Sequence, residues 1–334
     1  MTVSVGVIGT GMIGQAHIRR MTSAVAGARV AAVSDVDADR AKQAAAQAGA
    51  RPLASGEDVI ADADVEAVVV ASSGPTHARY VLAAITAGKP VFCEKPLATT
   101  AADALSIVRA EPHAGRRLVQ VGFMRRYDPG YRQLKAVLGS GEIGAPLMVH
   151  CVHRNPSAPE SYVSEMAVTD TAIHEIDAVR WLLGEEIVSA QVLTPRPTTR
   201  KYAHLRDPQI ILFETASGVR VDVEVFVNCR YGYDVQCEAV AETGTARLPD
   251  PAGVTVRHAE RASTAVPQGW EERFADAFDA EFTEWIASVA AGEITGPSAW
   301  DGYAAALVSD AAVAAQHSGR TETVSIAERP AFYG

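Results

Sequence analysis

The sequence predicts a doubly wound α/β domain followed by an α+β domain with a large, mostly antiparallel open sheet. Three observations predict it. The chain has 334 residues, enough for about two domains. In its first third, short apolar runs without polar alternation are separated by Ala-rich helical patterns, as in parallel strands covered by helices on both faces. After the start of the second domain, several apolar runs alternate with polar residues, as in strands with one face in water.

The first domain is predicted to cover residues 1–122. Its predicted parallel strands are the runs Val3–Ile8, Arg29–Ser34, Glu66–Ala71, Pro90–Cys93 and Leu118–Val121. Its predicted helices are the segments Ile13–Ser23, Ala38–Ala48, Thr76–Ala87 and Ala101–Ala110. Strands and helices that alternate in this way bring the carboxyl ends of the strands to one edge of the sheet, where ligands bind.

The second domain is predicted to cover residues 123–334, with its start placed between residues 122 and 146 because the helix Pro129–Leu138 fits either side. Within Val219–Val225, valine alternates with charged residues, which favours an antiparallel sheet with one wet face. The predicted strands are Leu147–His153, Val188–Leu193, Gln209–Thr215, Val219–Val227, Tyr233–Ala241 and Thr323–Ile326. The predicted helices are Val168–Leu183, Glu271–Ala291 and Ala299–Gln316.

Charge and composition limit the class of ligand. The formal net charge is −10, which argues against nucleic acid and against an anionic membrane surface, because binding a polyanion needs clustered cations. No apolar stretch approaches the ~18–20 residues that span a bilayer. Four cysteines in a chain of this length do not form a disulfide framework, and the N-terminus shows no leader pattern. We therefore expect a cytoplasmic protein that acts on a small molecule.

The segment Gly9-Thr10-Gly11-Met12-Ile13-Gly14 has the spacing of a dinucleotide-binding turn, and it lies between a predicted strand and a predicted helix. Gly9 allows the tight turn, Gly11 lets the backbone approach a pyrophosphate, and Gly14 lets the helix pack against the strand. The N–H groups and the dipole at the helix N-terminus favour the phosphates. We expect Met12 and Ile13, within this turn, to contribute to the same cofactor site.

Asp35 ends the second predicted strand, about 20 residues after Gly14. A carboxylate there accepts hydrogen bonds from both ribose hydroxyls of NAD and repels a 2′-phosphate, and Val36 supplies no cation in its place. The sequence therefore predicts a Rossmann domain that binds NAD rather than NADP. A structural glycine turn with a solvated aspartate is the alternative.

Two further motifs carry polar chemistry. Lys95, in Cys93-Glu94-Lys95-Pro96, follows a predicted strand at the ligand-binding edge, where a lysine can stabilise negative charge on a substrate oxygen. Asp170 and His174 lie four residues apart, on one face of a predicted helix, and an imidazole beside a carboxylate suits removal of a hydroxyl proton. The alternatives are a solvated lysine, an Asp170 that only caps the helix, and a packed histidine.

These motifs together resemble the glucose–fructose oxidoreductase/inositol dehydrogenase (Gfo/Idh/MocA) family, and within it the members that oxidise inositol. The resemblance covers essentially the whole chain. The stretches that carry it are Val91–Thr100 (VFCEKPLATT), Arg117–Tyr127 (RLVQVGFMRRY), His150–Pro156 (HCVHRNP), Asp170–Asp177 (DTAIHEID), Val227–Glu238 (VNCRYGYDVQCE) and Gly296–Tyr303 (GPSAWDGY).

The resemblance implies NAD-dependent oxidation of a cyclic polyol, most simply myo-inositol to 2-keto-myo-inositol (scyllo-inosose), by a homotetramer assembled through the open sheet faces. It places Lys95, Asp170 and His174 in the catalytic set, with His174 as the base and Lys95 also near the cofactor. The residues that it implies for polyol binding, besides these three, are Met124, Arg125, Tyr127, His153, Asn155 and Tyr233, with Tyr231 a weaker candidate.

Other readings of the residues stay open. Relatives with the same catalytic set accept scyllo-inositol, D-chiro-inositol or glucose, and an NAD-binding sensor without activity is a further alternative. Arg125 with Arg126 would suit a sugar acid.

A possible metal cluster is formed in the sequence by His150, Cys151 and His153. However, His150 and Cys151 point to opposite faces of a strand and no matching ligand pair follows, so no metal is expected. Cys229 and Cys237 are expected to pack within the sheet.

Overall fold

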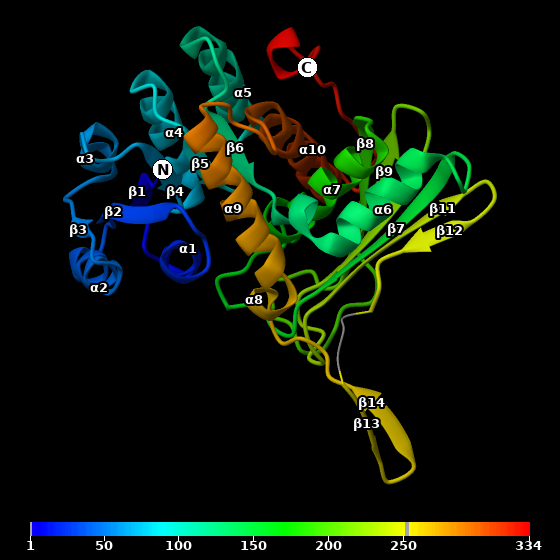
Figure 1. Ribbon diagram of the computed structural model, residues 1–334. Coiled ribbons are helices and arrows are strands. Elements are labelled where there is room, and N and C mark those ends of the chain that lie inside the picture. The colour runs from blue at the N-terminus through cyan, green and yellow to red at the C-terminus, as the bar shows by residue number, and fades with distance from the viewer. Residues whose placement is uncertain (1, 251–253) are drawn as a thin grey trace. The chain divides into compact units, whose positions relative to one another are not determined.

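The computed structural model describes residues 2–250 and 254–334 (Figure 1). The chain forms two compact units. The first comprises the chain up to Phe123 together with Phe278–Ala306 and Ala327–Gly334, and the second comprises Met124–Ala277 and Leu307–Ile326. The sequence predicted two continuous domains, 1–122 and 123–334. The contacts instead assign two later segments to the first unit.

The first unit is built on a six-stranded sheet in the order β3-β2-β1-β4-β5-β6, and all of its neighbouring strands are parallel. The strands are β1 (Val3–Ile8), β2 (Ala28–Ser34), β3 (Arg51–Pro52), β4 (Ala67–Val70), β5 (Val91–Glu94) and β6 (Val119–Gly122). The helices between them are α1 (Met12–Ser23), α2 (Ala38–Ala48), α3 (Gly56–Ala61), α4 (His77–Thr86) and α5 (Ala101–Ala110). The predicted doubly wound domain is confirmed, whereas β3 and α3 are too short to show a period in the sequence.

A helix from far along the chain completes the core of the first unit. Phe282, Trp285 and Ile286 of α9 (Ala275–Ala291) pack in one buried cluster with Val3, Val5 and other residues of the parallel sheet. Figure 1 draws α9 in orange, beside the strands of that sheet. The two aromatic rings are completely buried, which explains why this segment belongs to the first unit.

The C-terminal helices differ from prediction in one respect. The single helix expected over Glu271–Ala291 is broken after Arg273, so that α8 (Trp270–Arg273) precedes α9. Phe274, the residue at the break, is 1% exposed and has a non-helical backbone. The last long helix, α10 (Ala299–Ser318), lies close to its predicted bounds.

The second unit contains a seven-stranded sheet in the order β12-β11-β7-β10-β9-β8-β15. Only the β7–β10 pair is parallel among its neighbouring strands within residues 2–250 and 254–334, so the sheet is mixed but mostly antiparallel, as predicted. The strands are β7 (Pro146–Arg154), β8 (Ile187–Leu193), β9 (Gln209–Thr215), β10 (Arg220–Phe226), β11 (Asp234–Ala241), β12 (Thr245–Arg247) and β15 (Glu322–Thr323). Burial alternates along β9, β10 and β11, which leaves one face of the sheet open.

Two helices, α6 (Pro129–Ser140) and α7 (Ile173–Leu183), lie over the same part of the second unit (Figure 1). The hairpin of β13 (Thr255–His258) and β14 (Arg261–Thr264) extends away from the sheet, and every residue in its strands is exposed. The hairpin was not predicted from the sequence, because strands with both faces exposed to water show neither an apolar run nor a regular alternation.

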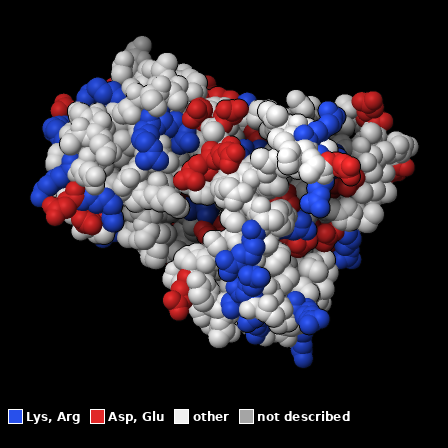
Figure 2. Space-filling view, turned by 90° about the horizontal axis from the view of Figure 1, so that it is seen from below, with Lys and Arg blue, Asp and Glu red and all other residues white. Residues whose placement is uncertain are grey.

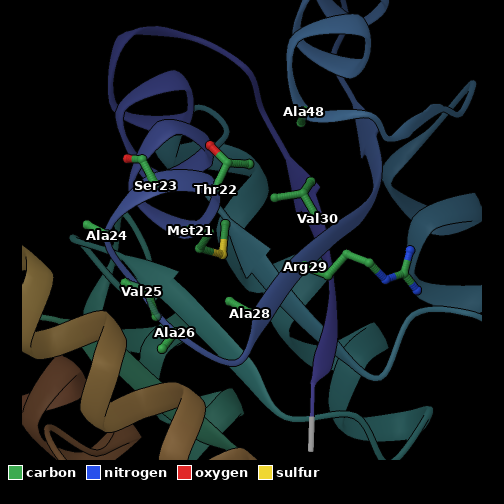
Figure 3. Close-up of a pocket in the computed structure, with 10 residues that line it drawn as sticks. All are labelled: Met21, Thr22, Ser23, Ala24, Val25, Ala26, Ala28, Arg29, Val30 and Ala48. Carbon is green, nitrogen blue, oxygen red and sulfur yellow. The ribbon is translucent and has the colours of Figure 1, made fainter.

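One hollow of about 470 Å³ lies at the end of the first unit's sheet where β2 begins. It is lined by the end of α1, the turn that follows it and the start of β2, and Figure 3 labels Met21, Ser23 and Val30 among the lining residues. Since β2 begins here, the hollow is at the edge opposite to the carboxyl ends of the strands.

Among the described residues, no helix has the length and apolar character needed to cross a bilayer.

We predict that Gly14→Ala destabilises the first unit. A Cβ atom at residue 14 would lie 2.0 Å from the carbonyl oxygen of Gly9, which is backbone and cannot rotate away. Overpacking costs about 1–3 kcal/mol, and a clash with backbone belongs at the upper end of that range. The measurement is the free energy of unfolding in urea.

Gly139→Ala is the matched control, because Gly139 is an exposed helical residue and a Cβ there would meet nothing within 4 Å. This change should raise stability by about 0.5–1 kcal/mol. Equal effects of the two substitutions would contradict the close packing of α1 on the β1 turn.

Candidate functional site

The glycine turn between β1 and α1 has the geometry that a dinucleotide needs. Gly9 has φ +93°, and a Cβ atom there would lie 2.5 Å from the carbonyl oxygen of Ala71. Gly11 is the N-cap of α1, has no atoms within 4 Å of a built Cβ, and no side chain caps this helix end. The turn therefore leaves open space in front of the first N–H groups of α1, and these residues fit the pyrophosphate of NAD. Met12 is 70% exposed beside it.

Asp35 directly follows β2, and its carboxylate is bound by groups of the protein itself. Its Oδ2 accepts hydrogen bonds from the backbone N–H of Thr10 (2.6 Å) and from the Thr10 hydroxyl (3.0 Å). Its Oδ1 accepts from the backbone N–H of Asp37 (2.9 Å) and from Arg40 Nη2 (2.5 Å). Burial acts to raise the pKa of Asp35, but these hydrogen bonds outweigh it and lower the pKa to about 2. The carboxylate is thus ionised at neutral pH and remains an acceptor.

Arg40 corrects one expectation about the cofactor. At the sequence level, Val36 after Asp35 supplied no cation, and in the structure the Val36 side chain is fully exposed. Five residues further along, however, the guanidinium of Arg40 turns back from α2 to Asp35. Because the carboxylate of Asp35 neutralises the Arg40 guanidinium, Arg40 does not attract the 2′-phosphate of NADP while this ion pair is intact. The Arg40 side chain is 38% exposed and has room to move when a ribose hydroxyl approaches Oδ1.

Lys95 lies at the carboxyl end of β5, at the same edge of the sheet as the glycine turn. Its backbone N–H donates to Glu94 Oε2 at 3.2 Å, and its peptide bond to Pro96 is cis. The neighbouring strand β6 pairs Gly122 with Glu94, and the chain passes into the second unit two residues later. Lys95 itself is half-buried.

Asp170 and His174 belong to the second unit, and the helix that carries them differs from prediction. The first turn, Ala167–Ala172, is π-helical, and α7 begins only at Ile173. The N-cap of α7 is Ala172, so Asp170 does not cap this helix. π-Helical turns insert an extra residue and are frequent at functional sites. Asp170 is half-buried within the turn, whereas His174 is 8% exposed in the first turn of α7.

A buried network lies beside His174. The His153 ring centroid is 6.2 Å from that of His174, and His153 Nδ1 lies 3.0 Å from Arg125 Nη2 and 3.1 Å from Glu175 Oε1. Arg125 also forms a direct ion pair with Glu175, and both side chains are 1% exposed. Burial acts to raise the pKa of Glu175, but the charges of Arg125 and His153 outweigh it and lower the pKa. The network therefore fixes the ring of His153.

The other ring nitrogen of His153 faces a tyrosine. Tyr233 Oη lies 3.3 Å from His153 Nε2, and burial raises the pKa of Tyr233 to about 12. The phenol is thus protonated at neutral pH and keeps a proton to donate. An imidazole N and a phenol side by side can each donate to or accept from a neutral hydroxyl group, which is the chemistry needed to bind a polyol.

The two arginines that suggested a sugar acid each have a carboxylate partner. Arg126 pairs with Asp177 through Nε (2.9 Å) and Nη2 (2.5 Å), and Arg125 pairs with Glu175. Both charges are already neutralised, so the pair does not form an anion clamp. The carboxylate-substrate alternative therefore loses its structural basis.

The remaining predicted polyol residues are also in the second unit. Met124 and Tyr127 are buried in the short 3₁₀ turn that starts the unit, and the Tyr127 ring lies 5.0 Å from the guanidinium carbon of Arg132. Asn155 follows β7, where its backbone N–H donates to the Phe226 carbonyl at 2.9 Å. Tyr231 is 46% exposed, and its hydroxyl contacts Asp234 and Arg154 on the open face of the sheet.

The His150, Cys151 and His153 cluster is divided between the two faces of β7. His150 is exposed and contacts Asp222, whereas Cys151 is buried against Cys237 with 3.8 Å between the sulfur atoms. No group of three His, Cys, Asp or Glu side chains in the described parts of the chain is arranged to hold a metal ion. Cys237 packs within the sheet as expected, while Cys229 lies in the loop after β10 and donates to the Gly232 carbonyl.

Glu175 and Asp177 lie within one of the family-like motifs, but the sequence predicted no role for these carboxylates. One signal was available. Glu175 and Asp177 stand among apolar residues such as Ile173, Ile176 and Val179, and a carboxylate buried among such residues needs a partner. The partners Arg125 and Arg126 come from a segment about 50 residues earlier, which the sequence alone does not pair with them.

Basic side chains do not form one continuous surface on the face shown in Figure 2. Lys and Arg lie in small groups among acidic and neutral side chains there. This face therefore lacks the extended cluster of cations that a polyanion requires.

Comparison with known proteins identifies the family. Residues 3–123 match the model of the Gfo/Idh/MocA oxidoreductase family for its NAD-binding Rossmann fold, and residues 135–326 match the model for its C-terminal alpha/beta domain. The inositol 2-dehydrogenase 3 of Saccharopolyspora erythraea is 62% identical over 334 residues, covering 100% of this chain and 99% of that protein. The inositol 2-dehydrogenase of Burkholderia cenocepacia is 58% identical over 335 residues, with the same coverage.

A solved structure agrees in fold over the full length. The crystal structure of the myo-inositol dehydrogenase from Lactobacillus casei, in complex with NAD(H) and myo-inositol, has a TM-score of 0.98, 43% identity and complete coverage of both chains. The glycine turn, the strand-end lysine and the two domain matches therefore lead to one conclusion: this chain belongs to the Gfo/Idh/MocA family of NAD-binding oxidoreductases.

Proposed function

We propose that this protein is an NAD-dependent dehydrogenase that oxidises a secondary alcohol of myo-inositol to 2-keto-myo-inositol. The observation that carries the proposal is the full-length likeness to the myo-inositol dehydrogenase that was crystallised with NAD(H) and myo-inositol. The chemistry of the second unit supports it, because His153 and Tyr233 offer hydrogen-bonding groups while both nearby arginines are neutralised by carboxylates.

The mechanism follows from three side chains. Bound NAD supplies the acceptor for the hydride that leaves the carbinol carbon. His174 takes the proton of the hydroxyl on the same carbon, and Asp170 orients the imidazole and stabilises its charged form. Lys95 donates a hydrogen bond to that oxygen and stabilises the negative charge that develops on it. No metal is needed in this scheme.

In this proposal the three catalytic residues also bind the substrate, and Lys95 contacts the cofactor as well. The glycine turn (Gly9, Gly11, Met12, Ile13, Gly14) and Asp35 hold the dinucleotide. The residues assigned to the rest of the polyol ring are Met124, Arg125, Tyr127, His153, Asn155 and Tyr233. Among these, Arg125 acts mainly by holding His153, since its own guanidinium is 1% exposed and already bound to Glu175.

The choice among polyols is the finer part of the proposal. The rivals are scyllo-inositol, D-chiro-inositol and, as a hexose 1-dehydrogenase reaction, glucose. Following NADH formation by its absorbance with each polyol separates them by kcat/KM. The same assay tests the sensor alternative, which requires that NAD binds but is reduced with none of them.

We also propose a homotetramer assembled through the open face of the second unit's sheet, in the cytoplasm, where NAD is present and the four free cysteines stay reduced. Met148 and Leu193 on this sheet are 42% and 43% exposed, and a hollow of about 230 Å³ is lined by Met148, Leu212 and Asp222 among others. Exposed apolar side chains on one face favour association with another protein surface.

We predict that His174→Ala lowers kcat for myo-inositol oxidation by about 10²–10⁴-fold, which is the usual contribution of a general base. NAD binding, measured by fluorescence titration, should change less than about twofold, because His174 lies in the second unit. The control His113→Ala removes an exposed histidine of the first unit and should leave kcat unchanged. Near-normal turnover of the His174 variant would refute its role as the base.

We predict that Asp35→Ser raises the ratio of kcat/KM for NADP to that for NAD by about 10–100-fold. The change removes a carboxylate that repels the 2′-phosphate and frees the Arg40 guanidinium, and one charge-assisted hydrogen bond accounts for a factor of this size. Asp39→Ser is the control, because it removes the same charge four residues further along, in the first turn of α2, where Asp39 pairs with Lys42. An unchanged ratio in the Asp35 variant would exclude a ribose contact.

We predict that Met148→Glu converts the tetramer into smaller species in sedimentation velocity. An unpaired charge buried in the interface costs about 3 kcal/mol or more, and each copy of the interface would carry it. Tyr202→Glu, at a residue 37% exposed outside the sheet, should leave the mass unchanged. A tetramer that persists in the Met148 variant would place the interface elsewhere.

A further inference from the structure

The main chain around Lys95 is tied down on both sides by buried side chains. Before it, the Lys95 N–H donates to Glu94 Oε2 at 3.2 Å. After it, the carbonyl oxygen of Pro96 lies 2.6 Å from Nδ1 of His77. His77 is 1% exposed, and its other ring nitrogen lies 3.0 Å from the Ser72 carbonyl at the end of β4. The segment that carries the proposed catalytic lysine is therefore anchored to the neighbouring strand end.

Glu94 is a buried carboxylate for which the fold leaves a specific space. It is 6% exposed, and a Cβ atom at Gly122 on the neighbouring strand would lie 3.3 Å from its carboxyl carbon. Burial acts to raise the pKa of Glu94, but the hydrogen bond from His17 and the positive charge of Lys95 outweigh it and lower the pKa. Glu94 is therefore ionised and accepts a hydrogen bond with each of its oxygens.

His17, in α1, holds the second oxygen of Glu94. Its Nε2 lies 2.6 Å from Glu94 Oε1, and its Nδ1 lies 2.9 Å from Arg20 Nη1. A guanidinium can only donate, so Nδ1 accepts and the single ring proton is on Nε2, where it is donated to Glu94. Burial lowers the pKa of His17 and keeps the ring neutral. The rings of Phe92 and Phe282 pack against it, with centroids 5.9 and 4.4 Å away.

Arg20 links this chain of hydrogen bonds to the helix that returns from the C-terminal part of the sequence. Its Nε lies 2.6 Å from Asp279 Oδ1 in α9, and its guanidinium carbon lies 4.9 Å from the ring centroid of Phe278. The path Asp279–Arg20–His17–Glu94 therefore ends at the backbone of Lys95, and all of it lies within the first unit.

We propose that Glu94, His17 and His77 are positioning residues that set the place of the Lys95 amine. The inference rests on the proposed role of Lys95 at the substrate oxygen. The amine of a lysine is carried on a flexible four-carbon chain. Its position therefore becomes still less defined when the backbone that carries it can move. A displacement of about 1 Å at a reacting centre costs about 10²-fold in rate, which makes such anchoring functional as well as structural.

The test is a double-mutant cycle of Glu94→Gln and Lys95→Ala, measured by kcat for myo-inositol oxidation. Glutamine keeps the shape of Glu94 but cannot accept from both His17 and the Lys95 N–H through two carboxylate oxygens. We expect Glu94→Gln alone to lower kcat by about 10–10²-fold while NAD affinity changes less than about twofold. In the Lys95→Ala background the same change should lower kcat by less than about twofold, because the residue acts through Lys95.

Two sets of variants separate positioning from stability. Glu111→Gln removes another buried carboxylate of the first unit, which binds the N–H groups of Leu118 and Val119 at the start of β6, far from the ligand-binding edge. It should lower the melting temperature and leave kcat within about twofold.

His17→Gln offers an amide N–H to Glu94 and a carbonyl to Arg20, so it should retain more activity than His17→Leu. His77→Asn, with an amide N–H for Pro96, should likewise exceed His77→Leu.

Each outcome bears on one of the two proposals. Equal losses for Glu94→Gln with and without Lys95, or normal kcat in both His17→Leu and His77→Leu, would overturn the positioning role while the function stands. Normal kcat in Lys95→Ala would instead overturn the proposed function of Lys95 itself. A loss in Glu94→Gln that disappears in the Lys95→Ala background supports both.

Discussion

The functional segments of this protein depend on one constraint: a carboxylate that is removed from water must be paired. Glu94 is paired with His17 in the first unit, and Glu175 with Arg125 in the second. Removing Arg125 would leave an uncompensated buried charge on Glu175, at a cost of about 3–5 kcal/mol, and removing the neutral His17 ring would leave one oxygen of Glu94 without its hydrogen bond. Each pair therefore has essentially one arrangement. Lys95, which donates its backbone N–H to Glu94, and His153, which contacts Glu175, are held in place by these pairs.

The two units carry different halves of the chemistry. The first presents helix N–H groups and an ionised Asp35, which suit the phosphates and ribose of a dinucleotide. In the second, the buried charges cancel within the protein, and what faces His174 is the imidazole of His153 with a protonated phenol beside it. A neutral, hydroxyl-rich molecule suits such a surface better than an anion does. This division is the physical basis for assigning a polyol dehydrogenase activity.

The first unit is not one continuous stretch of the chain, because α9 packs on its sheet. Its apolar residues Phe282, Trp285 and Ile286 cover one face of the parallel sheet, so a segment near the C-terminus becomes part of the N-terminal core. The same helix supplies Asp279, which holds Arg20. The periodicity of α9 indicated a helix in the sequence, but an apolar helical face carries no information about which of two sheets it will cover.

The sequence by itself determined the features that depend on local spacing. The alternation of apolar runs and helices identified the parallel sheet, and the glycine spacing identified the turn between β1 and α1, because both follow from backbone geometry over a few residues. The tertiary structure alone decided the π-helical turn under Asp170, the Arg40–Asp35 pair and the partners of Glu94 and Glu175. These depend on which side chains exclude water from one another, and residues as far apart as 17 and 94 meet only after the core has formed.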